Sequence, residues 1–264
     1  VALCQLDRSY LRALSAYQKV VTQRNSLLRA LCDQEARPNA ESTDAQLSFW
    51  DDQLVQYGSQ VIARRQQFIA QLQLVASQRH SELSEGREAL QLHYLPSFNP
   101  GTLSDFDFAR LKEPRTADWP QTPTAVEPTT VAEHYRAKPR TRRDREIASA
   151  TTLYGPHRDD LRLVANGRDL RIYGSRGQQR TAALALKLAE VAVSTVTTGV
   201  TPLLLLDDVM SELDAQRRHT LLTALGDTQQ AIITTTDWED FAPEFLSAAQ
   251  RLTVAAGAVH RAEL

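Results

Sequence analysis

Two short stretches of the sequence carry residues that could bind a phosphate group and a metal ion. The first, 172–190 (IYGSRGQQRTAALALKLAE), places Ser175, Gly177 and Gln178 directly before a segment with helical periodicity. The first backbone N–H groups of a helix have no partner within the helix, and the helix dipole favours negative charge there. A glycine-bearing turn at this point is a candidate phosphate site, although an ordinary strand-to-helix turn has the same composition.

The second stretch is an apolar run that ends in two acids, 202–209 (PLLLLDDV). A continuous apolar run of this length is typical of a strand buried on both faces. Ligands of open parallel sheets lie at the carboxyl ends of the strands, where Asp207 and Asp208 are placed. One carboxylate there can hold Mg²⁺ through its water shell while the next orients a nucleophile. The alternative is an acidic strand end that caps the next helix.

The elements before these stretches are predicted to be two long amphipathic helices. In the first thirty residues the apolar side chains follow a near-heptad pattern that only Arg24 interrupts. A second such pattern runs from 44 to about 83, which makes a helix roughly 60 Å long at 1.5 Å per residue. Gly58 is its expected weak point. Two long helices joined by the short turn at 32–43 predict an antiparallel α-helical hairpin arm over residues 1–91.

The rest of the chain, 92–264, has an α/β pattern. A strand-like piece (LQLHYLP) leads into a proline-rich stretch at 97–130, which we expect to be a flexible insert. Two apolar runs around Asn166 and Gly167 predict a β-hairpin with a type I′ turn. The helix that begins near residue 176 is predicted to extend to about 196.

Composition excludes a few classes of protein. The formal net charge of −2 excludes a surface that is basic all over, although 136–146 (RAKPRTRRDRE) has six basic and two acidic residues. Such a run is usually a solvated face or a flexible link.

No apolar run reaches the length of a membrane span, so we expect no membrane partner. Cys4 and Cys32 have no metal-ligand spacing and indicate reduced thiols in a cytosolic protein.

Several motifs together resemble one family. The sequences SRGQQ (175–179), LLLLDD (203–208) and SELD (211–214) are similar, in order and spacing, to the signature motif, Walker B motif and D-loop of ABC-type ATPase heads. The sequences YGPHRDDL (154–161) and QRNSLL (23–28) narrow the resemblance to the RecF family of bacterial recombination mediators. The resemblance covers nearly the whole chain apart from the proline-rich insert. The combination is specific, although each motif alone is not.

The resemblance implies the carboxyl-terminal lobe of an ABC-type (P-loop NTPase) ATPase head, carried with the helical arm. It implies an ATP-dependent homodimer that closes head to head around two nucleotides, with Mg²⁺ as the second cofactor. The implied partners are DNA at single-/double-strand junctions or gapped duplex, and RecR and RecO, with which the family helps to load RecA.

The resemblance also assigns roles to individual residues. Asp207 would support Mg²⁺ through water, and Asp208 would be the catalytic residue that polarises the attacking water. The signature and D-loop residues would contact the nucleotide held by the partner subunit; they are Ser175, Arg176, Gly177, Gln178 and Asp214. The candidates for DNA contacts are Arg140, Arg142 and Arg143 in the basic run and Arg64 and Arg65 on the arm.

The sequence departs from the family pattern at two points. A P-loop needs GxxxxGK followed by Ser or Thr, and none of the four lysines follows a glycine. Because RecF-like proteins have this motif near the N-terminus, we interpret the sequence as a piece that begins within the arm, and expect it neither to bind ATP tightly nor to hydrolyse it alone. Thr235 and Thr236 stand where many ABC ATPases have a switch histidine.

Two other functions fit the same residues. One is a different SMC-like or ABC-type ATPase with the same chemistry. The other is a non-enzymatic helical scaffold whose α/β part only docks a partner. Magnesium-dependent nucleotide binding by the intact parent protein would distinguish an ATPase from a scaffold, because a scaffold needs no nucleotide.

Overall fold

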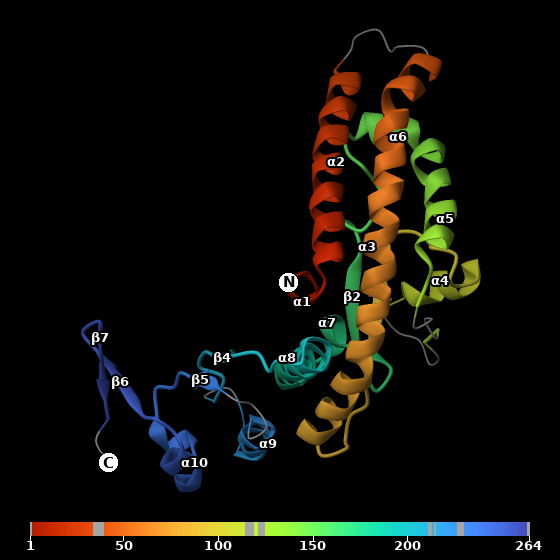
Figure 1. The fold of residues 1–264 in the computed structure, drawn as a ribbon. Helices are drawn as coiled ribbons and strands as arrows, with labels where there is room; N and C mark the ends of the chain where they lie inside the picture. Colours follow the sequence, from red (N-terminus) through yellow and green to blue (C-terminus); the bar gives the residue numbers. More distant parts are fainter. Residues whose placement is uncertain are drawn as a thin grey trace.

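The computed structural model describes residues 2–33, 40–113, 119–120, 125–210, 213, 215–225 and 230–262. Two long helices, α2 (Arg8–Cys32) and α3 (Ala40–Leu83), run side by side in opposite directions (Figure 1). The expected second helix is confirmed over 44 residues without a break. The first helix is divided, because the carboxylate of Asp7 accepts hydrogen bonds from the N–H groups of Ser9 and Tyr10 and so starts α2 after the short α1 (Ala2–Leu6).

Gly58 is a packing residue, and the prediction of a weak point there was wrong. Helix α3 continues through it, and its missing side chain makes room for two aromatic rings. A Cβ atom at Gly58 would lie 2.7 Å from Cε1 of Tyr135 and 3.1 Å from Cε2 of Tyr17. Glycine therefore lets α3 approach both α2 and α5 (Pro128–Thr141) closely.

Arg24, which interrupts the apolar pattern of α2, is the centre of a buried polar cluster. Its side chain is fully buried. It donates hydrogen bonds to Asp51 (2.9 Å), Glu146 (2.5 Å) and the hydroxyl of Thr152 (2.9 Å). These partners lie on α3, on α6 (Arg143–Ala148) and in the segment that follows α6. One arginine thus ties four parts of the chain together.

The second half of α3 belongs to the main hydrophobic core. Leu72, Ala76 and Leu83 pack in one cluster with residues of β1 (Leu90–Leu95) and of α8 (Arg176–Thr198). By length and composition α8 is apolar enough to cross a membrane, but several of its apolar side chains are buried in this cluster, as in a core helix. Since α3 is shared between the helical pair and the α/β part, a division of the chain at residue 91 stays a prediction.

A small antiparallel sheet precedes α8 in the chain. Strand β1 pairs with β2 (Asp160–Ala165), and β2 pairs with β3 (Arg168–Asp169). Asn166 and Gly167 both have positive φ, +49° and +77°, so the expected type I′ turn is confirmed. The second run of this hairpin is strand for only two residues, because Asp169 caps the short helix α7 (Leu170–Tyr173).

The acidic stretch follows a short parallel strand pair. Strand β4 (Leu204–Leu206) pairs with β5 (Ala231–Ile233), which confirms the expected strand. Burial on both faces was a wrong prediction for the described chain, because Leu205 is 66% and Ile232 51% exposed. Only the opposite face, with Leu204 and Leu206, packs in the core.

Several shorter elements complete the described chain. Within the proline-rich stretch, where little regular structure was expected, the structure has the helix α4 (Asp105–Leu111), which Ser104 caps. Beyond β4 come α9 (Ala215–Leu225), a 3₁₀ turn at Trp238–Asp240 and α10 (Pro243–Ala248). The hairpin of β6 (Leu252–Ala255) and β7 (Ala258–Arg261) stands apart from the long helices (Figure 1).

Candidate nucleotide-contact site

Ser175 begins helix α8 as its N-cap. Its hydroxyl oxygen accepts a hydrogen bond from the N–H of Gln178 (3.2 Å), and its own N–H donates to Oε1 of Gln178 (2.8 Å). This reciprocal pair is a capping box. Ser175 and Arg176 are exposed. Among the described residues, no acceptor contacts the backbone N–H of Arg176 or Gly177, so both can donate to an anion.

The space beside Gly177 is open. A Cβ atom there would meet only Nη1 of Arg217, at 3.8 Å, and the hydroxyl of Ser175, at 3.9 Å. Arg217 lies on α9, and nothing in the sequence indicated that it approaches this turn. A guanidinium, the dipole of a helix of 23 residues and two N–H groups therefore favour a negative charge at the same point.

The two acids after β4 are exposed, and the hydroxyl group of one threonine contacts both residues. Thr234, at the end of β5, donates from Oγ1 to Oδ1 of Asp207 (2.6 Å) and accepts from the N–H of Asp208 (3.0 Å). Its own N–H donates to the carbonyl of Leu206 (2.9 Å). Asp208 has a φ of +49°, a left-handed conformation that aspartate tolerates. Sequence reasoning missed Thr234, whose only signal was its place directly after the strand AII.

The residues fit magnesium only as a lightly coordinated ion. In the described part of the chain no group of three or more His, Cys, Asp or Glu side chains lies close enough to hold a metal. Asp207 can offer a single carboxylate, which suits Mg²⁺ because this ion keeps several of its waters.

Some candidates are placed differently or lie outside the described residues. Asp214 and most of the SELD sequence are outside them. Thr235 donates from its hydroxyl to the carbonyl of Asp237 (2.9 Å) and accepts from the N–H of Asp237 (3.2 Å). These two contacts stabilise the turn after β5.

The five candidate arginines have different surroundings. Arg143 forms ion pairs with Asp44 (2.9 Å) and Asp51 (2.6 Å). Arg65 is half-buried and donates to the hydroxyl of Tyr10 (3.0 Å) and the carbonyl of Pro156 (2.5 Å).

The remaining three of these arginines are exposed. Arg64 lies 3.5 Å from Asp7, and its side chain is 53% exposed. Arg140 lies on α5 and Arg142 directly after it. Arg140 and Arg142 are therefore the members of the basic run that are better placed for a phosphate than Arg143.

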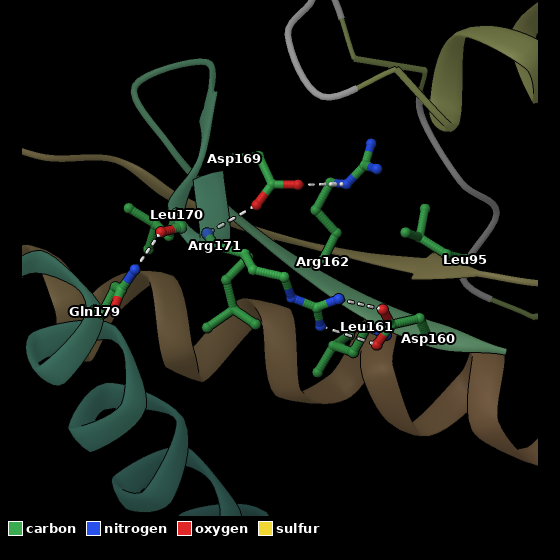
Figure 2. A pocket seen from close by; sticks show the side chains of 9 residues that line it. Leu95, Asp160, Leu161, Arg162, Asp169, Leu170, Arg171 and Gln179 are labelled. Atoms are coloured by element: carbon green, nitrogen blue, oxygen red, sulfur yellow. Dashed lines mark hydrogen bonds and ion pairs between the residues drawn. The ribbon is translucent and has the colours of Figure 1, made fainter. Parts of the chain in front are cut away.

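A cavity of about 190 Å³ lies between β2 and α7 (Figure 2). Its charged side chains pair with one another: Arg162 with Asp169 (2.9 Å), and Arg171 with Asp160 (2.7 Å). Gln179, which also lines it, donates to the carbonyl of Leu170 (2.8 Å). The two ion pairs around the cavity join β2 to β3 and to α7. The hydrogen bond from Gln179 joins the first turn of α8 to α7.

The comparisons with known proteins agree on one group, the proteins named RecF. A solved structure of the recombination mediator protein RecF with ATP, from the RecFOR pathway, superposes with a TM-score of 0.76 at 28% sequence identity. The match covers 99% of this chain and 61% of that one. The mixed helix and strand architecture is therefore the one that this RecF structure has over the matched part.

Sequence comparison specifies the family. DNA replication and repair protein RecF of Chloroflexus aurantiacus is 40% identical over 260 residues, and that of Heliobacterium modesticaldum is 42% identical over 260 residues. Each match covers 98% of this chain, so the chain belongs to the RecF family. It spans about 60% of the length of these curated relatives. No family model matches the chain.

Proposed function

We propose that this chain is the signature-bearing part of a RecF-type ATPase that dimerises on ATP, binds DNA and helps RecO and RecR to load RecA at single-strand gaps. The observation that carries the proposal is the open start of α8, where Ser175 and Gly177 border an exposed, electropositive turn. The relatives are named as DNA replication and repair proteins, and a related structure contains ATP.

The phosphate at this turn belongs to the partner subunit in our proposal. The sequence has no GxxxxGK motif, so its own residues do not form the cradle that holds a nucleotide from the other side. A helix start with two available N–H groups can instead complete a site that a second subunit brings to it. Ser175, Arg176, Gly177, Gln178 and Asp214 are the proposed contacts in trans.

The acid pair supplies the proposed chemistry. Bound Mg²⁺ would neutralise charge on the transferred phosphate, and Asp207 would hold it through water. The carboxylate of Asp208 would accept a hydrogen bond from the attacking water and orient it toward the γ-phosphate. Thr234 contacts the two acids differently: its hydroxyl donates to the carboxylate of Asp207 and accepts from the backbone N–H of Asp208.

DNA binding is proposed for the exposed arginines of the basic run, above all Arg140 and Arg142. With a net charge of −2, the attraction to DNA must come from a local surface. Single-/double-strand junctions or gapped duplex are the proposed targets, and the cytosol is the proposed location. The helical pair α2 and α3 is the proposed arm.

The substitution Asp208→Asn tests this function in the longer, ATP-binding protein that we propose contains this chain. The amide keeps the shape but cannot act as a base, so ATP binding and dimerisation are expected to persist while hydrolysis falls at least about 100-fold. Asp52→Asn, at an exposed position on α3, is the matched control and should hydrolyse normally. Unchanged hydrolysis by Asp208→Asn would remove this residue from the mechanism.

A further inference from the structure

A chain of side-chain contacts connects the first turn of α8 to the end of α3. The amide nitrogen of Gln178 donates to Oε1 of Glu88 (2.8 Å), while its Oε1 accepts from the N–H of Ser175 (2.8 Å). Both ends of this amide are therefore held. Since Gln178 closes the capping box, Glu88 also determines how firmly the box is closed.

Glu88 reaches farther, to a buried histidine of α3. Its Oε2 lies 3.5 Å from Nε2 of His80, and the His80 side chain is fully buried. Burial lowers the pKa of His80, and this effect outweighs the opposing effect of the nearby Glu88. The charge of Arg217, the residue that approaches Gly177, also lowers the pKa of His80, so Arg217 lies near this ring. The signature turn and the last turns of α3 thus share one polar cluster.

The backbone around Glu88 is fixed at both sides. The turn after α3 reverses at Glu85 and Gly86, which have φ values of +54° and +72°, and the N–H of Gly86 donates to the carbonyl of Ser81 (2.8 Å). On the other side, the N–H of Ala89 donates to Oδ1 of Asn166 in the β2–β3 turn (2.9 Å). Glu88 is therefore presented from a rigid turn, as a positioning residue needs to be.

We propose that Glu88 is a positioning residue for the signature turn: it holds Gln178, so that the N–H groups of Arg176 and Gly177 keep the direction in which they meet the partner's phosphate. This inference rests on the proposed function. It extends that function by naming the residue through which the end of α3 acts on the nucleotide contact, although Glu88 itself touches no nucleotide.

The contact is tested first in this chain without nucleotide. In Glu88→Ala, Gln178 loses its acceptor, so the amide resonance of Ser175 in ¹⁵N NMR spectra is expected to shift and its hydrogen exchange to become at least about tenfold faster. In Glu88→Gln the side-chain oxygen can still accept from Gln178, and both measurements should stay near the wild-type values. Glu82→Ala, an exposed glutamate in the last turn of α3, is the matched control. An unchanged Ser175 amide in Glu88→Ala would overturn the proposal.

The consequence is tested in the longer ATP-binding protein. ATP-dependent dimerisation, measured by sedimentation, is expected to weaken about tenfold in Glu88→Ala and less than about twofold in Glu88→Gln and Glu82→Ala. A Ser175 amide that shifts without any loss of dimerisation in Glu88→Ala would overturn the positioning role. A wild-type protein that stays monomeric with ATP would instead overturn the proposed function, whatever the Ser175 amide does.

Discussion

The polar cluster around Arg24 and the acid pair after β4 are built in opposite ways. The side chains of Arg24 and Glu146 are at most 1% exposed, and each is held by hydrogen bonds to other protein groups. Asp207 and Asp208 are exposed, and the hydroxyl of Thr234 contacts the carboxylate of Asp207 and the backbone N–H of Asp208. Charged groups that satisfy one another in the interior hold elements together, whereas charges left facing solvent from a fixed backbone are available for a ligand.

The motif YGPHRDDL (154–161) is built like the cluster around Arg24, because its polar side chains contact other protein groups. His157 forms a hydrogen bond between Nδ1 and the hydroxyl of Tyr17 (2.6 Å). Its Nε2 donates to the carbonyl of Thr152 (3.1 Å). Asp159 accepts from the hydroxyl of Tyr94 and from the N–H of Ser97. Burial raises the pKa of Asp159 and lowers that of His157. This motif, on which the family resemblance partly rests, therefore joins α2 to β1.

Removing Arg24 should have the largest effect on stability. Arg24→Ala leaves the buried carboxylate of Glu146 without its cation, while Asp51 keeps its pair with Arg143, and such a loss costs about 3–5 kcal/mol of the free energy of unfolding. Urea denaturation measures this change. Arg29→Ala, at an exposed position of the same helix, should change it by less than about 0.5 kcal/mol. Equal effects of the two substitutions would contradict the structural role given to Arg24.

Acid should destabilise the buried region through His93. This side chain is 7% exposed, and burial, with a smaller effect of Arg162, lowers its pKa from 6.5 to about 4. Between these values the unfolded chain binds more protons than the folded one, so stability falls as the pH is lowered from 6.5 to 4. The loss is roughly 3 kcal/mol for this residue.

The substitution His93→Phe should flatten that part of the pH profile, as measured by urea denaturation at several pH values. His260→Gln, at an exposed position of β7, should leave the profile unchanged. A smaller slope of the same sign should remain in His93→Phe, because burial also lowers the pKa of His80 and His157. A profile identical to the wild type would show that His93 is not protonated on unfolding in this range.

The basic run offers the same comparison within a few residues, with smaller effects. Replacing Arg140 and Arg142 together by alanine should weaken binding to all DNA sequences alike and lower the slope of log affinity against log salt by about two units. Arg143→Ala should instead lower stability, since it breaks the pairs with Asp44 and Asp51. DNA affinity in a salt series, together with denaturation, measures both. Unchanged DNA affinity in the double variant would move the proposed contact surface elsewhere.

Local signals in the sequence predicted the local structure well. The periodicity of 44–83, the Asn166–Gly167 turn and the helix start at Ser175 all depend on neighbours in the chain, and the structure has each of them. The break at Asp7 was missed because the apolar pattern continues across it. The close packing at Gly58 was missed because its partner Tyr135 is 77 residues away.

The residues of the candidate site also fall into two groups: those that the sequence could reveal and those that it could not. The cap at Ser175 and the acids at the end of β4 could be found from one segment each. Thr234, Arg217 and Glu88 could not, since each acts on a residue of another element. Periodicity predicts which face of an element is buried, but it does not say which distant residue meets it. Contacts between elements are therefore what the structure adds.

The trans contact of the signature turn is the central claim, and Ser175→Arg tests it most directly. The larger cation fills the open space where the partner's phosphate is proposed to enter, while nucleotide binding within each subunit is unaffected. In the longer ATP-binding protein, sedimentation with ATP and Mg²⁺ should show monomers that still bind ATP, whereas the control Ser48→Arg, at an exposed position of α3, should dimerise normally. Dimers of Ser175→Arg as stable as those of the wild type would contradict the account.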